Sequence, residues 1–482
     1  MVIGGGLSGL GAAMILRSFD HEVILIEKSN LLAPLVRGFS RQGLAFETGF
    51  HYAGGLGKDG VLYRYLDRLG LIAQGLETLP LPDRAEILRF PDGDVAIPGQ
   101  YDDFRALFPK KHHIDDFFNL SRLSFNRSPY LNHEISSFDS RHMNDEGPTL
   151  ANQLNALDLP QKWQDVLGFR CFLYGVRPSE SSFVRFSVVN VPYLDGGYSF
   201  KGGGLALVQS FEKALRAAGV KLLTGREVTA IKTNKANAVE AVIFKEADGH
   251  TTEVDCDSCI YSGHPAALPY LLPQGSLRPV LAKRLAALKE TPLPLMLFAH
   301  TGSAWLAGRQ LFIAPGNGLD FWLDARKPLI YVSGGPGDNG RWPVSAMTLL
   351  PPEALASWQN DKNSVHPPDY YEFKKKAAEA LRLRILNSCP ELNGDLEIAE
   401  AATGLTLKRY SFNSGFSIYG KSHSIHEAPV LPLTRVGGLS LAGQNIVMPG
   451  LLGVMVSSAL AAGCLTGHQP VLEFFRKPTR KA

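Results

Sequence analysis

The sequence predicts an α/β fold organised around a dinucleotide-binding βαβ unit, and three features of its first residues support this. A short apolar strand, Val2–Ile3, runs directly into the glycine-rich segment Gly4–Gly9. A helical segment, Leu10–Phe19, follows, and a second apolar strand, Val23–Ile26, comes after it. A strand, a glycine-rich turn, a helix and a second strand in this order are typical of the phosphate-binding half of a dinucleotide site.

Each glycine of this segment meets its own physical requirement. Gly4 permits the tight turn after the strand, Gly6 lets the backbone approach a pyrophosphate, and Gly9 lets the helix pack closely on the strand. The start of the following helix presents free N–H groups and a positive dipole end to the phosphates. Leu7 and Ser8 lie at this helix start and belong to the same predicted site.

The second strand leads to an acidic residue, Glu27, at about the 20-residue offset where a carboxylate reaches a ribose hydroxyl. Lys28 follows it and is assigned to the same site. Arg37 is the one cation between Leu31 and Phe39. Two interpretations of Arg37 stay open: it faces the pyrophosphate, or it is a surface arginine.

Composition limits the classes of function. The 482 residues suffice for two or three domains, and a net charge of only +3 gives no support for a nucleic-acid partner. Five cysteines, an odd number, argue against a disulfide framework. The chain begins inside its first strand with no signal peptide before it, and the shortness of that strand suggests that a few residues are missing. We expect a cytoplasmic protein, or one at the cytoplasmic face of a membrane.

The next segments combine a hairpin with a helical region. Residues Phe39–Tyr52 read as a hairpin, and Val61–Leu71 reads as an amphipathic helix. Residues 81–194 carry helical periodicity between proline-bounded turns, which predicts a mainly helical substrate domain. Residues 110–113, Lys-Lys-His-His, are predicted to be a solvated turn in preference to a metal or phosphate site.

Strand-rich structure then returns. Gly202–Gly204 lead into a predicted helix, Leu205–Ala218, and Gly219 is placed as its C-terminal cap. The strands expected after it are Val220–Thr224, Glu227–Ile231, Ala238–Phe244 and Thr251–Val254. Cys256 and Cys259 follow at the end of these strands, where neither a helix start nor a second ligand pair is near, so structural cysteines are expected and no metal site.

Residues 266–402 form a second predicted insertion. Two helices are expected within it, Leu281–Lys289 and Tyr370–Cys389. Strands near Leu295–Ala299, Leu329–Val332 and Ala346–Leu350 predict a sheet that floors the substrate region.

The last organised block is a second strand–loop–helix unit. A short apolar strand ends at Gly443-Gln444, and Pro449-Gly450 precede a long apolar run within Ile446–Leu465. This run has the length of a membrane span, but its proline, glycines and serines favour a buried helix under a cofactor. The tail, with aromatic and basic residues from Phe474 to Lys481, has two interpretations: contact with an anionic membrane surface, or a solvated terminus.

The ordered motifs resemble those of the phytoene desaturase-like flavoproteins, and within them most closely the carotenoid isomerase and retinol saturase branch. The resemblance covers most of the chain, although the insertions match only as architecture. The matching residues are Gly4–Gly9 with Glu27-Lys28; Arg41-x-Gly43 with Gly49-x-His51-Tyr52-x-Gly54; Gly202–Gly204; Thr406-x-x-Arg409-Tyr410 with Gly415 and Tyr419-Gly420; and Ala442–Gln444 with Pro449-Gly450-x-x-Gly453.

This resemblance implies an α/β fold of the amine-oxidase and phytoene-desaturase type. A discontinuous Rossmann-type FAD-binding domain would comprise residues 1–80, 195–265 and 403–470. A mixed α+β substrate domain with a helical insertion would comprise residues 81–194 and 266–402.

The implied cofactor is FAD. The resemblance assigns its ADP half to Gly4, Gly6, Gly9 and Glu27, with the backbone of Val228 beside the adenine. It places the ribityl chain and the isoalloxazine beside Gly443, Gln444, Pro449, Gly450 and Leu451. A positive helix end there would stabilise negative charge on a reduced flavin.

One departure from the family pattern affects the phosphate contact. Relatives usually carry two glycines six and seven residues after the acid, where the backbone meets the pyrophosphate, and this chain has Ala33-Pro34. Proline removes an N–H donor and fixes φ. The resemblance therefore implies weaker or different FAD binding at this point.

The implied substrate is a long, apolar, conjugated molecule in a tunnel between the insertions and the flavin. His51, Tyr52, Arg409 and Tyr419 are the polar residues expected near the ring as proton donors or polarisers, and a structural role explains each equally well. No electron donor or acceptor is identified, and no second nucleotide motif points to a dedicated NADPH-binding domain.

The predicted reaction is saturation or cis–trans isomerisation of a C=C bond in a polyene or isoprenoid. Three other flavin reactions stay open: oxidative desaturation, reductive cyclisation of a polyene and, less favoured, amine oxidation. A non-catalytic flavin-binding protein is the alternative from a different class.

Overall fold

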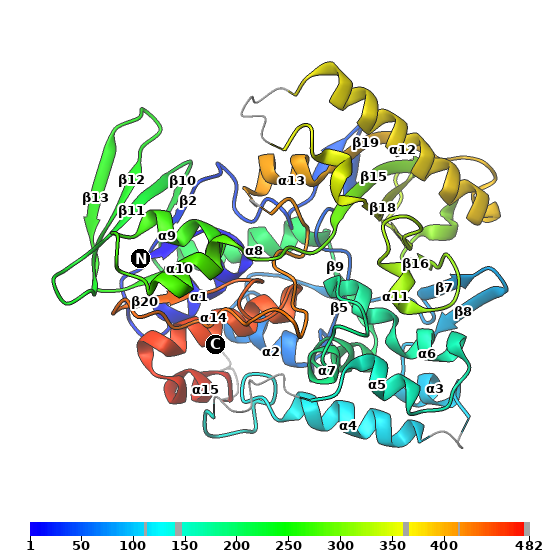
Figure 1. Ribbon diagram of the computed structural model, residues 1–482, viewed down its shortest axis with the longest axis horizontal. Helices are drawn as coiled ribbons and strands as arrows, with labels where there is room; N and C mark the ends of the chain where they lie inside the picture. Colours follow the sequence, from blue (N-terminus) through cyan, green and yellow to red (C-terminus); the bar gives the residue numbers. More distant parts are fainter. Residues whose placement is uncertain (110–112, 140–146, 360–365, 413–414, 477–482) are drawn as a thin grey trace.

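The computed structural model describes residues 1–109, 113–139, 147–359, 366–412 and 415–476. Its first layer is a five-stranded sheet in which every neighbouring pair is parallel. The strand order is β10 (Lys221–Thr224), β2 (Ile24–Glu27), β1 (Val2–Ile3), β14 (Cys259–Tyr261) and β20 (Leu439–Leu441). Segments from both ends of the chain thus lie side by side in one sheet (Figure 1).

Three helices pack around this parallel sheet. They are α1 (Leu7–Arg17), α8 (Gly203–Ala217) and α14 (Leu451–Thr466). Helices α1 and α14 contain only small and apolar residues on their shared side, and their side chains form one core with α2 (Val61–Arg68) and α15 (His468–Arg476). The predicted buried helix near the C-terminus is confirmed, because eleven residues of α14 are buried.

No helix in the described part of the chain is both long and apolar enough to span a bilayer. The C-terminal aromatic residues also face inward. Phe475 is fully buried in the core, and the ring of Phe474 packs against Phe19 and beneath the guanidinium of Arg68. These aromatic side chains pack within the fold, the basic residues after Arg476 lie outside the described residues, and the membrane contact of the tail stays a prediction.

A seven-stranded sheet forms the second layer. Its order is β19 (Glu397–Thr403), β15 (Leu293–Thr301), β18 (Trp342–Leu350), β17 (Ile330–Gly334), β16 (Gln310–Ile313), β7 (Glu86–Phe90) and β8 (Gly93–Ile97). The predicted sheet in residues 266–402 is confirmed, and it is larger than expected. The β7–β8 hairpin lies inside the region predicted to be mainly helical, where Pro91-Asp92 make its turn.

Both faces of this sheet are buried, because alternate residues of each strand face opposite sides. Along β15, Leu295 and Leu297 join the core beneath α12 (Pro368–Ser388), whereas Met296 and Phe298 join the core on the other side. The helices that cover that other side are α4 (Ile114–Asn126), α5 (Leu150–Asn155), α6 (Gln161–Gly168) and α7 (Phe183–Asn190), and α3 (Tyr101–Ala106) packs with them. Figure 1 shows α12 at the upper right and these helices below.

Three smaller sheets complete the strand structure. A three-stranded antiparallel sheet projects beside the parallel sheet (Figure 1): β11 (Glu227–Thr233), β12 (Val239–Lys245) and β13 (Thr251–Asp255). The predicted hairpin is confirmed as β3 (Phe39–Arg41) and β4 (Leu44–Phe46). The third joins β5 (Ala53–Gly54), β9 (Gly197–Phe200) and β6 (Thr78–Pro80).

The strands divide between the two layers as the predicted domains do. All five parallel strands fall within residues 1–80, 195–265 and 403–470, and the seven-stranded sheet falls within 81–194 and 266–402, except for the last residue of β19. The domain boundaries themselves stay a prediction.

Candidate cofactor and active site

The start of α1 forms an open anion cradle. Gly6 is the N-cap residue, no side chain caps it, and the first turn carries no acidic residue. A Cβ atom placed on Gly6 would meet no described atom within 4 Å. Because free N–H groups and the positive dipole end both face this space, it fits a phosphate or pyrophosphate group.

The neighbouring glycines are required by close packing. A Cβ atom on Gly9 would lie 1.9 Å from the carbonyl oxygen of Gly4, so only glycine allows the helix this close to the strand. Gly4 itself has φ +106°, a conformation that side chains disfavour. Gly5 was not singled out from the sequence, yet a Cβ there would lie 2.9 Å from the Cβ of Glu27.

The carboxylate of Glu27 lies at the end of β2 beside this cradle. It accepts hydrogen bonds from the backbone N–H of Gly5 at 2.5 Å and of Ser29 at 2.7 Å. Burial raises its pKa above the usual value, against these two hydrogen bonds. Lys28 points elsewhere, because its Nζ forms a 2.7 Å ion pair with Glu227. Val228, the residue after Glu227, lies on β11 at an irregularity in the pairing with β12.

The Ala33-Pro34 segment adopts the conformation that glycine would favour. Ala33 is buried with φ +42°, and its N–H donates to the carbonyl oxygen of Gly5 at 2.8 Å. The carbonyl oxygen of Ala33 accepts from the N–H groups of Val36 and Arg37 at 2.9 and 3.2 Å. This turn therefore brings half-buried Arg37 near the glycine-rich segment, while the N–H of Ala33 is used within the protein.

A second cradle lies at the start of α14. Gly450 is its N-cap residue with φ +88°, no side chain caps it, and a Cβ on it would meet nothing described within 4 Å. Gly443, with φ +127°, donates its N–H to Ser457 Oγ at 2.8 Å. A Cβ on Gly443 would lie 3.7 Å from Ser8 Oγ, so the two cradles adjoin.

The remaining residues of this second cradle hold its loop in place. Gln444 Nε2 donates weakly to the carbonyl oxygen of Ile418 at 3.4 Å. The backbone carbonyl oxygen of Gln444 lies 2.8 Å from His423 Nε2. Pro449 and Leu451 are buried on either side of Gly450. Two uncapped helix starts with open glycines fit a cofactor that has both phosphates and an electron-accepting ring.

Glu47 explains the Gly202–Gly204 motif. A Cβ on Gly203 would lie 1.7 Å from Glu47 Oε1, and the N–H of Gly204 donates to the Glu47 carboxylate at 3.2 Å. The carboxyl thus lies at the start of α8, and burial raises its pKa to about 7.

Of the four predicted catalytic residues, His51 and Tyr419 lie among buried aromatic side chains. The His51 ring is 5.3 Å from that of Tyr331, and its Nδ1 is buried with no hydrogen-bond partner among the described residues. Burial lowers the pKa of His51 to about 4, so its imidazole is neutral at pH 7. Burial raises the pKa of Tyr419 well above the usual value, and a Cβ on Gly175 would lie 3.0 Å from the Tyr419 ring.

Tyr52 belongs to a buried polar network that the sequence did not reveal. Its hydroxyl donates to Glu86 Oε1 at 2.6 Å, and Arg170 donates to Glu86 Oε2 at 2.6 Å. Arg170 also donates to Asn190 Oδ1 at 2.8 Å. The pairing of Glu86 with Arg170 joins β7 to a helical turn 84 positions later, which no local motif could have indicated.

Arg409 lies apart from this buried region. It is exposed on α13 (Gly404–Ser411), where its guanidinium is 5.6 Å from the ring of its neighbour Tyr410.

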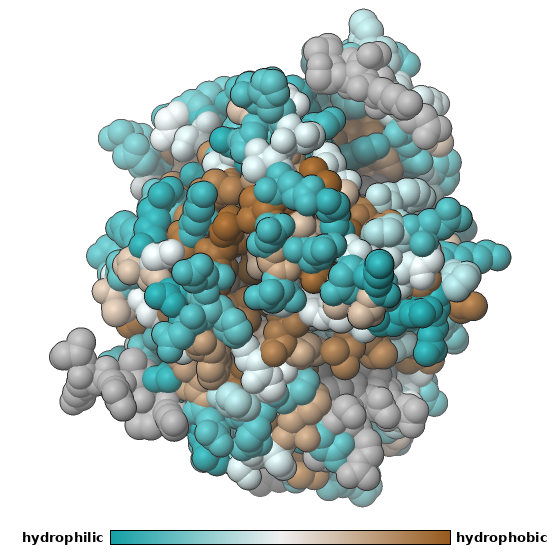
Figure 2. Space-filling model, turned by 90° about the vertical axis from the view of Figure 1, so that its left-hand side faces the viewer, coloured by the Kyte–Doolittle hydropathy of each residue, from teal (hydrophilic) through white to brown (hydrophobic). Residues whose placement is uncertain are grey.

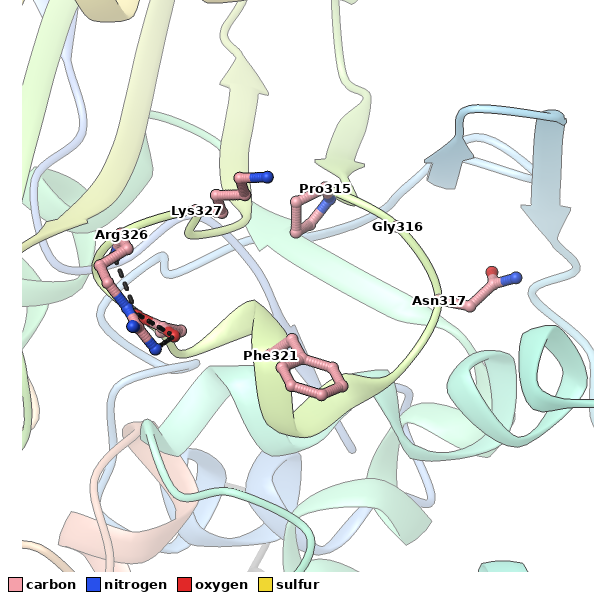
Figure 3. A pocket seen from close by; sticks show the side chains of 7 residues that line it. Pro315, Gly316, Asn317, Phe321, Arg326 and Lys327 are labelled. Atoms are coloured by element: carbon pink, nitrogen blue, oxygen red, sulfur yellow. Dashed lines mark hydrogen bonds and ion pairs between the residues drawn. The ribbon is translucent and has the colours of Figure 1, made fainter.

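The cysteines and one surface cavity lie outside the predicted site. All five cysteines are free thiols, as predicted, and no group of described residues could hold a metal ion. A surface cavity of about 360 Å³ is lined by Pro315, Phe321 and the Asp324–Arg326 pair (Figure 3), and it contains none of the predicted site residues. Figure 2 shows a different face, on which apolar side chains gather in a central hollow with a polar rim.

Comparison with known sequences supports the dinucleotide fold and extends it. Residues 2–69 match the NAD(P)-binding Rossmann-like domain family. The chain is 23% identical over 98% of its length to all-trans-retinol 13,14-reductase of Danio rerio, covering 87% of that protein. It is 20% identical over 96% of its length to an inactive all-trans-retinol 13,14-reductase of the same organism, covering 84% of it. A 4,4'-diaponeurosporene oxygenase of Staphylococcus haemolyticus matches over only 48% of this chain and 49% of its own, at 24% identity.

Solved structures share the fold across the whole chain. An oxidoreductase from Methanosarcina mazei aligns with a TM-score of 0.67 at 16% identity, over 95% of this chain and 98% of its own. A putrescine oxidase aligns with a TM-score of 0.62 at 13% identity, over 99% and 98%. These similarities confirm the predicted amine-oxidase-like fold and the resemblance to the phytoene desaturase-like oxidoreductases, in the retinol saturase branch. The prediction that the chain is an oxidoreductase is confirmed with them.

Proposed function

We propose that this chain is an FAD-dependent oxidoreductase that saturates or isomerises a C=C bond of a long, apolar polyene. The observation that carries the proposal is the similarity to retinol 13,14-reductases over nearly the whole length of both chains. The two adjoining glycine cradles support the choice of FAD, since a dinucleotide with a ring at one end needs both. The apolar hollow in Figure 2 suits an apolar substrate.

We assign the cofactor contacts to the open positions of the two cradles. The pyrophosphate would lie at the start of α1 beside Gly6, with Glu27 towards the ribose. Gly443, Gly450 and Leu451 would hold the ring end at the start of α14. When bound, FAD supplies hydride or electron transfer. The residues of the chain bind and orient it and exclude water.

Among the polar residues, His51 and Tyr419 are the best candidates to contact the substrate or the ring. The neutral imidazole of His51 has an unused Nδ1, which can make a hydrogen bond to a bound group. Tyr419 keeps its phenolic proton at neutral pH, because burial raises its pKa. Tyr52 and Arg409 are better explained as structural, since Tyr52 donates to Glu86 and Arg409 faces solvent.

The reductive direction is favoured over an oxidative one. The retinol reductase match covers 98% of the chain, whereas the diaponeurosporene oxygenase match covers 48%. A non-catalytic flavoprotein is the competing class. The similarity to an inactive all-trans-retinol 13,14-reductase of Danio rerio supports this alternative.

The test is anaerobic flavin spectroscopy on the purified protein. We expect flavin bands that bleach with dithionite and return when all-trans-retinol or another polyene is added. Product analysis then separates the reactions, because saturation consumes one reduced flavin per bond and isomerisation gives turnover without net reoxidation. Absence of flavin after purification and reconstitution contradicts the cofactor assignment. Flavin that no polyene reoxidises and that isomerises none indicates the non-catalytic class.

A further inference from the structure

A buried lysine lies beside the second cradle. Lys421 is only 1% exposed. Its Nζ donates to the carbonyl oxygen of Ser422 at 2.8 Å. Its backbone N–H donates to Asn445 Oδ1 at 2.7 Å, which fixes it against the residue that follows Gln444. An ammonium group removed from water is costly unless negative charge compensates it.

The surroundings of Lys421 add positive charge. Arg185, on α7, and Arg284, on α10 (Pro279–Ala286), repel its ammonium, and burial together with these charges lowers the pKa of Lys421 to about 8. His423, two residues away, stays neutral because burial lowers its pKa well below the usual value.

The nearby carboxylates do not compensate this charge by direct pairing. Glu290 is used elsewhere, because its Oε1 lies 2.7 Å from His264 Nε2 and its Oε2 accepts from Ser417 Oγ at 2.7 Å. Glu427 is half-exposed and acts on Lys421 only at longer range. Among the residues that the structure describes, the hydrogen-bond partner of the Lys421 ammonium is the carbonyl oxygen of Ser422, and no carboxylate pairs with it.

The position of Lys421 relates this charge to the proposed site. Tyr419 lies two residues before Lys421. Its ring is close to the aromatic side chains of Tyr193 and Tyr331. On the other side, His423 contacts the carbonyl of Gln444 in the cradle loop. The ammonium therefore lies on the segment that joins the aromatic region to the ring end of the cofactor cradle.

We propose that Lys421 binds the anionic end of the substrate, and that the preferred substrate class is a polyene carboxylate. The inference rests on the proposed function and specifies its substrate. A carboxylate supplies a full negative charge and accepts the two N–H bonds of the ammonium that Ser422 leaves unused. An alcohol or a hydrocarbon of the same length would leave the buried charge uncompensated.

The experiment compares all-trans-retinoate with all-trans-retinol, which share a hydrocarbon chain and differ at one end. Each is titrated into the FAD-loaded, oxidised protein, and binding is followed by quenching of protein fluorescence. We expect about 10- to 100-fold tighter binding of the carboxylate, the range for a charge-assisted hydrogen bond. Lys421→Met should abolish this preference while retinol affinity holds, and Lys421→Arg should retain most of it.

Lys289→Met is the matched control. Lys289 is exposed and lies on the adjacent segment, because its carbonyl oxygen accepts the N–H of Ser422 at 2.7 Å. The substitution therefore removes a lysine close to Lys421 in the fold but outside its buried environment. This variant should keep the carboxylate preference. If Lys421→Met does not fold, the wild-type protein still provides a test, because the preference should fall as pH rises through about 8, when the ammonium loses its proton. The charged groups facing it in that range are Arg185, Arg284, Glu290 and Glu427.

Three results would overturn the inference. They are equal affinity of the wild type for both probes, a preference that survives Lys421→Met, and an effect of Lys421→Met confined to the reduced flavin, which would assign the ammonium to the cofactor. Failure of the proposed function looks different: no flavin binds, or no polyene of either kind is converted by the reduced protein.

Discussion

The hydroxyl of Ser458 in α14 donates to the carbonyl oxygen of Ser8 in α1 at 2.8 Å, joining residues 450 positions apart. Gly11 lies opposite, where a Cβ atom would be 2.8 Å from the same hydroxyl. This contact fixes the two uncapped helix starts relative to each other. This serine and this glycine therefore contribute to the spacing between the phosphate cradle and the ring cradle.

Enlarging Ser458 should separate the two cradles. We expect Ser458→Val to lower FAD affinity at least tenfold. The valine methyl groups would collide with Gly11, and the hydrogen bond to the Ser8 carbonyl oxygen would be lost. Ser458→Ala removes the hydrogen bonds alone and should cost only about 1 kcal/mol of unfolding free energy. Flavin titration and thermal unfolding measure the two effects. Unchanged FAD affinity in Ser458→Val would contradict this account of the helix pair.

Gly6 and Gly9, three residues apart, should respond differently to substitution by alanine. Gly6→Ala should leave the melting temperature of the apoprotein nearly unchanged, since its Cβ enters open space at an ordinary φ of −69°. The same methyl occupies the pyrophosphate position, so FAD affinity should fall at least tenfold. Gly9→Ala should instead destabilise the apoprotein, because its Cβ meets the Gly4 carbonyl oxygen. Equal melting temperatures for both variants would refute the distinction.

The carboxyl of Glu47 should make stability fall with rising pH. Its folded pKa of about 7 exceeds the ordinary value of 4.5, so protonated Glu47 stabilises the fold at low pH. That contribution is lost as pH rises from about 4.5 through about 7, and its upper limit is on the order of 3 kcal/mol. Glu47→Gln, which still accepts from Gly204, should flatten the decline in melting temperature between pH 5 and pH 8. A decline of the same size in both proteins would exclude Glu47 as its source.

The network around Glu86 should prove structural. Tyr52→Phe is expected to lower the unfolding free energy by about 1–3 kcal/mol, since it leaves a buried carboxylate oxygen with one donor fewer. Its turnover number should stay within a few-fold of the wild type. Arg170→Met removes the charge partner of Glu86 and should cost about 3–5 kcal/mol. A large loss of turnover in a stable Tyr52→Phe protein would return Tyr52 to the catalytic candidates.

The sequence predicted best where local pattern determines structure. The βαβ start, the hairpin around Gln42-Gly43 and the apolar helix α14 each carry their glycines or periodicity within a short segment, and all three are confirmed. The β7–β8 hairpin was missed although Pro91-Asp92-Gly93 is a turn signal, because the surrounding helical periodicity dominated the interpretation.

Long-range contacts account for what the sequence did not reveal. Glu86 and Arg170 show no local motif, and only the fold places them together. In the sequence, nothing distinguishes Lys421 from a surface lysine. Only the fold buries it and brings Asn445, 24 positions later, to its backbone N–H. The inward packing of Phe474 and Phe475 likewise depends on partners in the first 70 residues, such as Phe19 and Tyr65.

The interleaved order of the parallel sheet has a consequence for biosynthesis. The amino group of Met1 donates to the carbonyl oxygen of Ser258, 257 positions later, and β20 joins the same sheet only at Leu439–Leu441. A growing chain therefore carries β1 and the apolar helix α1 for most of its synthesis without the strands and the helix that cover them. The cofactor cradle comes into existence only when nearly the whole chain has left the ribosome. A cofactor that binds at this cradle would therefore meet an almost complete polypeptide.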